Sequence, residues 1–67
     1  MIMMKNAAIL SEEYFLSYFR LLMNTRGCTE EQAYQLTVEQ IFEGDINLFG
    51  EDTKKNFKLA YKTVKGN

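Results

Sequence analysis

Few side chains in this sequence could carry out acid–base or metal chemistry. The 67 residues include no histidine and a single cysteine, Cys28. Histidine is the usual general base near neutral pH, and zinc sites are commonly built from several cysteines and histidines. The composition therefore predicts a protein that is not an enzyme, with no catalytic residue, no metal site and no cofactor. No small-molecule ligand is implied either.

The remaining candidates for chemistry have simpler structural interpretations. Cys28 lies just before a predicted helix, where a thiol can be activated, but no histidine is available to assist it. We expect it to be a small apolar residue in a helix–helix corner. Asp45, Asn47 and Gly50 fall where a calcium loop has its positions 1, 3 and 6, but position 12 would be Asn56 instead of a bidentate glutamate. This segment is predicted to be a turn.

Charge is distributed unevenly along the chain. Residues 1–50 carry three basic and seven acidic side chains, net −4, whereas residues 51–67 carry five lysines and two acids, net +3. One interpretation is a solvated lysine face on a helix whose acids come first and bases last, as the helix dipole favours. The other is an electrostatic patch for phosphate or an acidic protein, formed by Lys54, Lys55, Lys58, Lys62 and Lys65.

The elements that carry these residues are predicted to be three helices, so the fold class is all-α, a small helical bundle. Ser11 and Thr29 are favoured N-caps, and Thr29 with Gln32 matches a capping box. Gly27, Gly44 and Gly66 are natural helix stops. Together with the apolar periodicity, these signals predict helices near residues 12–26, 30–43 and 52–65.

The first predicted helix is unusually apolar. Its polar side chains form one narrow stripe, and most of the remaining circumference is aromatic or aliphatic. It could be the central helix of the bundle, or part of its apolar face could meet another chain; both hold in a homodimer. The candidate protein interface comprises Tyr14, Phe15, Tyr18, Leu21 and Leu22.

The predicted core combines the apolar stripes of all three helices. In addition, Ile46, Leu48 and Phe49 are too apolar for a loop that only faces water, and we expect them to cap one end of the core. The predicted core residues are Phe15, Tyr18, Phe19, Leu22, Val38, Ile41, Phe42, Phe57, Ala60, Tyr61 and Val64.

Two segments in the middle of the chain, RGCTEEQAYQL (residues 26–36) and GDINLF (residues 44–49), resemble parts of ubiquitin-associated domains. That resemblance implies three short helices, with a glycine in the first loop and an acidic second helix. The Met-Gly-aromatic loop of that family is absent, because Arg26 and Cys28 flank Gly27. No binding residue is carried over from it.

Chain length and composition favour an interaction module. We expect one domain over residues 1–67, with residues 1–10 as an arm or a strap over the core. A single core of this size rarely supplies more than about 3–5 kcal/mol of stability, and a lone cysteine cannot form an intramolecular disulfide. We therefore expect a cytoplasmic protein, without a membrane segment, that is a homodimer or binds a partner protein.

The leading functional hypothesis is a non-enzymatic protein–protein interaction or regulatory module, a character common among small accessory proteins of phages and mobile elements. The alternative is a DNA-binding regulator resembling a helix-turn-helix protein, in which the lysine-rich third helix contacts nucleic acid. Against it, the third helix lacks arginine, the usual reader of guanine in the major groove, and the net charge of the chain is −1.

Overall fold

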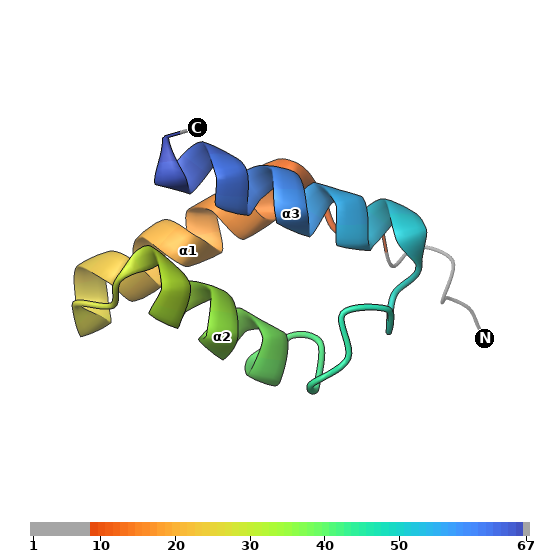
Figure 1. Cartoon of the computed structure of the whole chain (residues 1–67), viewed down its shortest axis with the longest axis horizontal. Coiled ribbons are helices and arrows are strands. Elements are labelled where there is room, and N and C mark those ends of the chain that lie inside the picture. Colours follow the sequence, from red (N-terminus) through yellow and green to blue (C-terminus); the bar gives the residue numbers. More distant parts are fainter. Residues whose placement is uncertain (1–8, 67) are drawn as a thin grey trace.

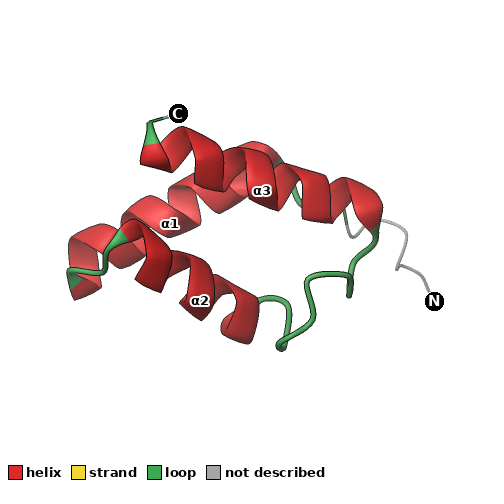
Figure 2. Ribbon diagram, viewed as in Figure 1, coloured by secondary structure: helices red, strands yellow, loops and turns green. Residues whose placement is uncertain are grey.

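Three α-helices form the secondary structure of the described part of the chain. The computed structural model describes residues 9–66. Helix α1 spans Glu12–Arg26, α2 spans Glu30–Gln40 and α3 spans Glu51–Lys65, with α1 behind the other two in the view of Figure 1. Loops join them, and no strand lies within the described residues (Figure 2). The predicted all-α class is confirmed; α1 has the predicted bounds and α3 begins one residue earlier than predicted.

The helix starts follow the predicted capping chemistry. The Ser11 hydroxyl accepts a hydrogen bond from the backbone N–H of Tyr14 at 3.0 Å. At α2, the Thr29 hydroxyl accepts from the backbone N–H of Gln32 at 3.1 Å, and the Gln32 side chain accepts from the backbone N–H of Thr29 at 3.0 Å. These three bonds satisfy N–H groups that a helix N-terminus leaves without partners, so these two helices begin where local sequence places them.

The prediction that the second helix continues to residue 43 was wrong by three residues. After Gln40, the N–H of Phe42 bonds to the carbonyl of Thr37, five residues back, and the N–H of Gly44 bonds to that of Val38, six residues back. The last turn is therefore wider than an α-helical turn. This widening accompanies the turn of Phe42 into the core, where it is fully buried.

The connection between α2 and α3 only partly caps the core. Ile46 and Phe49 are half-buried and pack against the core, as predicted, whereas Leu48 is 45% exposed, contrary to the prediction. The segment from Asp45 is a turn, as expected: the N–H of Leu48 bonds to the Asp45 carbonyl at 2.9 Å, and the N–H of Asn47 to the Asp45 carboxylate at 2.9 Å.

Helix α1 lies in the middle of the bundle, as predicted, because it packs against both other helices more extensively than they pack against each other. Six predicted core residues are buried: Phe15, Phe19, Leu22, Phe42, Phe57 and Ala60. The other five predicted residues are half-buried and pack around this cluster: Tyr18, Val38, Ile41, Tyr61 and Val64. The sequence prediction missed three fully buried residues: Ala33, Thr37 and Thr53.

Thr53 ties the segment before α1 to α3. Its hydroxyl accepts a hydrogen bond from the backbone N–H of Leu10 at 3.1 Å, and the side-chain amide of Asn56 donates to the Leu10 carbonyl at 2.9 Å. Leu10 also packs against the core. The predicted strap over residues 1–10 therefore has a structural counterpart at Leu10, while residues 1–8 lie outside the described part of the chain.

We predict that replacing Thr53 by valine lowers the free energy of unfolding by about 1–3 kcal/mol, because the N–H of Leu10 loses its acceptor in a partly buried place. The matched control is Thr37→Val at the other fully buried threonine. The Thr37 hydroxyl donates to the carbonyl of Ala33, one turn earlier in the same helix. Loss of this local hydrogen bond should lower the free energy of unfolding clearly less than the loss at Thr53. Urea denaturation measures both, and equal losses would contradict the assignment of the strap to Thr53.

Glu43 has a backbone φ of 55°, in the left-handed region that glycine tolerates best. We predict that Glu43→Gly raises the free energy of unfolding by roughly 0.5–1 kcal/mol, because it relieves this strain. The control is Glu39→Gly, an exposed position inside α2, which should lower stability by about 1 kcal/mol. Thermal denaturation of both variants tests the sign of each change.

Candidate functional site

The structure divides the five residues of the predicted interface between the surface and the core. Phe15 is fully buried and Leu22 is 4% exposed, so neither is available to a partner. Tyr14 is 42% exposed, Leu21 is 54% exposed and Tyr18 is half-buried. Successive helical residues are rotated by about 100°, so a one-residue step separates the core face from the surface. We call Tyr14, Tyr18 and Leu21 the α1 strip.

The α1 strip is held in place by contacts to its own helix and to α2. The rings of Tyr14 and Tyr18 are stacked, with centroids 6.4 Å apart and planes inclined by 4°. The hydroxyl of Tyr18 donates a hydrogen bond of 2.7 Å to the side chain of Gln40 at the end of α2. Tyr14 also packs edge-to-face against the buried ring of Phe15, with centroids 5.3 Å apart. Its exposed aromatic surface is thus anchored to the core.

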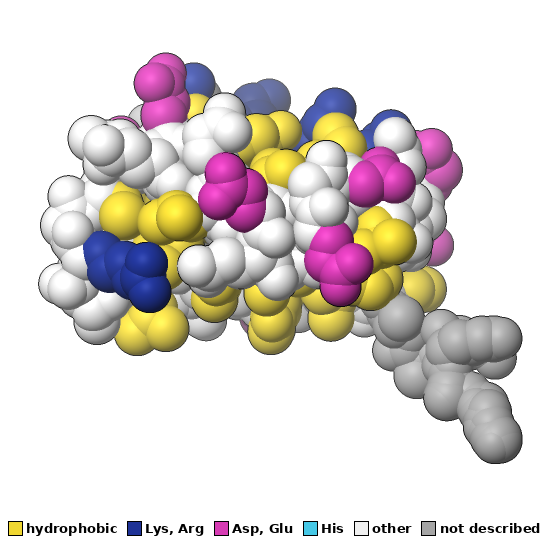
Figure 3. Space-filling model, turned by 90° about the horizontal axis from the view of Figure 1, so that it is seen from below, with side chains coloured by type: hydrophobic (Ala, Val, Ile, Leu, Met, Phe, Trp, Pro, Cys, Tyr) yellow, Lys and Arg dark blue, Asp and Glu magenta, His cyan; other side chains and the backbone are white. Residues whose placement is uncertain are grey.

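An open depression of about 450 Å³ lies over the α1 strip, and Ser17 contributes to its lining. Figure 3 shows the molecule from below the view of Figure 1, with hydrophobic side chains along the lower edge and in several separate places, and acidic side chains across the middle. The full lining comprises Ser11, Glu13, Tyr14, Ser17, Tyr18 and Leu21. The depression is open, in contrast to the concave pockets that bury most of the surface of a small-molecule ligand.

Four of the five lysines of the predicted electrostatic patch lie together. Lys54, Lys55, Lys58 and Lys62, with Glu51 and the 40% exposed Leu59, surround an open depression of about 410 Å³ on α3. The Lys54 ammonium donates to the Asn47 side chain at 2.9 Å and lies 3.7 Å from the Glu51 carboxylate. The Lys65 ammonium instead lies 5.1 Å from the ring centroid of Tyr61, in a cation–π contact.

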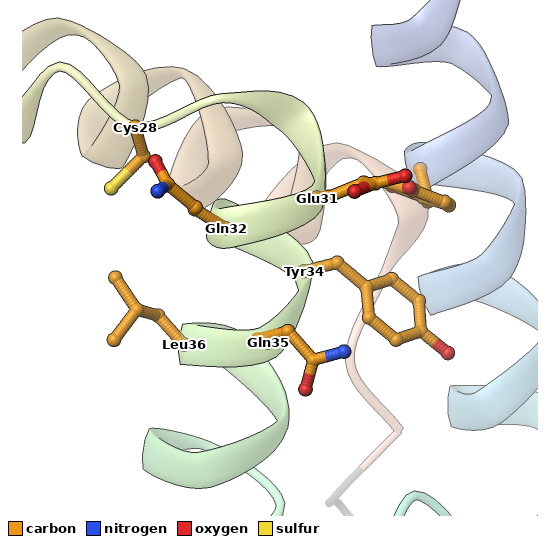
Figure 4. Close-up of a pocket in the computed structure, with 7 residues that line it drawn as sticks. Cys28, Glu31, Gln32, Tyr34, Gln35 and Leu36 are labelled. Atoms are coloured by element: carbon orange, nitrogen blue, oxygen red, sulfur yellow. The ribbon is translucent and has the colours of Figure 1, made fainter.

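A further depression, of about 820 Å³, surrounds α2 and was not foreseen from the sequence. In Figure 4, Cys28 and Leu36 point to one side of α2 and Tyr34 points to the other. The Tyr34 ring lies 4.7 Å from that of Phe57 and 4.6 Å from that of Tyr61, centroid to centroid, and links α2 to α3. The depression is therefore a surface wrapped around a helix, and its aromatic part is already used for packing.

The described residues offer no cluster for metal chemistry. Within residues 9–66, no group of three or more histidine, cysteine or acidic residues could hold a metal ion. None of the helices in this part of the chain is long and apolar enough to cross a membrane. Cys28 is half-buried and packs against the edge of the core, as predicted for a helix–helix corner.

The chain matches no protein-family model, and no curated protein or solved structure shows significant similarity to it. The partial resemblance to ubiquitin-associated domains accordingly has no counterpart among the family models.

Proposed function

We propose that this protein is a small non-enzymatic interaction module that binds protein through the α1 strip. The observation that carries the proposal is the combination of exposure and order at Tyr14, Tyr18 and Leu21. Their apolar surface is available to solvent, while stacking and the bond to Gln40 hold the two rings in place. Accessory proteins of phages and mobile elements, acting in the reducing cytoplasm that the lone thiol favours, fit this description.

The residue types of the α1 strip suit a contact with protein. Tyrosine is enriched at protein interfaces, where its ring buries a large area and its two side-chain torsions cost little entropy to order. In this chain part of that cost is met before binding, because Tyr18 is already bonded to α2. Leu21 adds an exposed aliphatic side chain about one helical turn after Tyr18. Complete burial of a fully exposed leucine is worth about 1.5–3 kcal/mol, and Leu21 is 54% exposed before binding.

We expect Leu21→Glu to abolish protein binding, because it places a charge in the middle of the apolar contact. The tagged chain would be used to capture proteins, including untagged copies of itself, from nuclease-treated lysate of cells that express it. The matched control is Leu59→Glu, at an exposed leucine on α3. Wild type and Leu59→Glu should retain the same protein, and Leu21→Glu should lose it. Equal retention by all three would contradict the proposed site. Circular dichroism confirms that each variant is folded.

The lysine cluster on α3 supports the second candidate, a nucleic-acid-binding regulator. Lys55, Lys58 and Lys62 line the same open depression on α3. Phosphate contacts supply most of the sequence-independent affinity for DNA. Residues 41–50 separate α2 from α3, however, and a helix-turn-helix has a turn of only about 3–4 residues. The observed connection therefore favours the interaction module over this alternative.

The two candidates respond differently to charge reversal on α3. If the protein binds DNA, Lys55→Glu with Lys58→Glu should weaken binding by at least tenfold and reduce its dependence on salt concentration. If the α1 strip is the binding site, the same double variant should retain its protein partner. Fluorescence anisotropy with duplex DNA over a salt series, run beside the capture experiment, decides between them.

A further inference from the structure

Four side chains of α1 form the kind of recess into which a facing helix inserts a side chain. Tyr14, Ser17, Tyr18 and Leu21 have the spacing i, i+3, i+4 and i+7, and together they line the depression of about 450 Å³. In helix–helix packing, a hole made by four such residues receives one protruding side chain of the partner helix. Ser17 is the smallest of the four and is exposed, so it leaves the middle of the hole open.

The same strip also presents an exposed aliphatic side chain that can cover one end of this depression. Leu21 is 54% exposed and projects from the rim of the depression. Tyr14 and Leu21 are equally far, in opposite directions, from the midpoint between Ser17 and Tyr18. A two-fold axis through that midpoint therefore brings Leu21 of one copy opposite Tyr14 of another. In one symmetric contact, Leu21 of each copy covers the Tyr14 end of the other copy's depression, which is the self-complementarity that a two-fold interface needs.

The charges beside the strip select the antiparallel orientation. Glu13 and Arg20 are seven residues apart, two helical turns, so they lie on the same flank of the strip, and both are exposed. Within the described part of the chain, neither side chain has an ion-pair partner. When two helices pack antiparallel, equivalent flanks meet. The axis at this midpoint brings Glu13 of each copy to within two residues, about 3 Å along the helix, of the level of Arg20 of the other. A parallel pair would instead place this flank against the flank of Tyr18, where α1 has no charged side chain.

We propose that two copies of this chain associate through α1, antiparallel and related by a two-fold axis near Ser17 and Tyr18. This inference rests on the proposed function, because it identifies the partner of the α1 strip as a second copy of the chain. The contact buries Tyr14, Tyr18 and Leu21 of both copies. Two Glu13–Arg20 ion pairs at its edge fix the direction of pairing; exposed ion pairs contribute little affinity, and their value here is in selecting orientation.

Cysteine cross-linking tests both the contact and its direction. In a Cys28→Ser background, Ser17→Cys places two thiols beside the two-fold axis, and mild oxidation should give a covalent dimer. Thr25→Cys is the matched control, because it is also on the exposed side of α1 but lies far from the axis in an antiparallel pair. The expected result is a disulfide dimer at position 17 and little at position 25. Cross-linking at position 25 as efficient as at position 17 would overturn the antiparallel arrangement.

Charge exchange provides a second test that does not depend on oxidation. Glu13→Arg and Arg20→Glu should each raise the dimer dissociation constant roughly tenfold, because each turns two attractive pairs into repulsive ones. An equimolar mixture of the two variants should form heterodimers close to wild-type affinity. Sedimentation equilibrium measures the dissociation constant of each variant and of the mixture. A mixture that associates no more tightly than the single variants would overturn the proposed pairing.

The outcomes also separate this inference from the proposed function. A wild-type chain that is monomeric at every concentration, yet retains another protein from lysate in a manner that depends on Leu21, would overturn the two-fold pairing and support the interaction module. A monomeric chain that retains no protein would overturn both. Concentration-dependent mass that Leu21→Glu abolishes and Leu59→Glu leaves intact supports both.

Discussion

The fold depends on one ring, that of Phe57, which is fully buried and contacts aromatic rings from every other part of the core. Its centroid lies 5.2 Å from that of Phe15, 5.6 Å from that of Phe19, 4.7 Å from that of Tyr34 and 4.9 Å from that of Phe42. These residues come from α1, from α2 and from the turn that follows α2. A short chain can thus unite three helices around a single side chain of α3, because aromatic rings bury a large area for each residue ordered.

This aromatic centre accounts for the irregular end of α2. Phe42 must reach both Phe57 and Phe15, whose ring centroids lie 4.9 Å and 5.6 Å from its own. The widened last turn and the left-handed Glu43 accompany that placement, and the connection then needs Asp45 and Asn47 to form the turns that lead to α3. Local backbone strain is therefore tolerated where a core contact requires it.

The exposed α1 strip is a geometric consequence of the same core. Phe15, Phe19 and Leu22 point inward with the spacing of one helical face, so Tyr14, Tyr18 and Leu21, each one position earlier, are displaced toward solvent. A helix with aromatic and aliphatic residues at both sets of positions can pack one face into the core and leave the adjacent face as a contact surface. The hydrogen bond from Tyr18 to Gln40 connects the exposed face of α1 to the rest of the fold, because it holds the ring of Tyr18 against α2.

Local chemistry in the sequence determined the class of fold, the helix starts and most of the core. The caps Ser11 and Thr29 act within three residues of themselves, and the apolar periodicity of each helix survives in the folded state, so both can be recognised without tertiary contacts. The sequence also identified Tyr14, Tyr18 and Leu21 as candidates for a surface contact, but grouped them with Phe15 and Leu22, because an unusually apolar helix does not show which face it buries.

Tertiary structure alone decided the remaining features. The burial of Thr53 depends on Leu10, 43 residues away, whose N–H bonds to its hydroxyl. The hydrogen bond of Thr37 is local, to a carbonyl one turn back, and its burial depends on the packing of α2 against the other helices. The separation of Lys65 from the other lysines depends on the Tyr61 ring, which packs against Phe19 of α1 and Tyr34 of α2. The early end of α2 depends on Phe57, which follows it in the chain. Each depends on contacts between residues that are distant in sequence. A pattern along the chain does not show which of these residues come together in the fold.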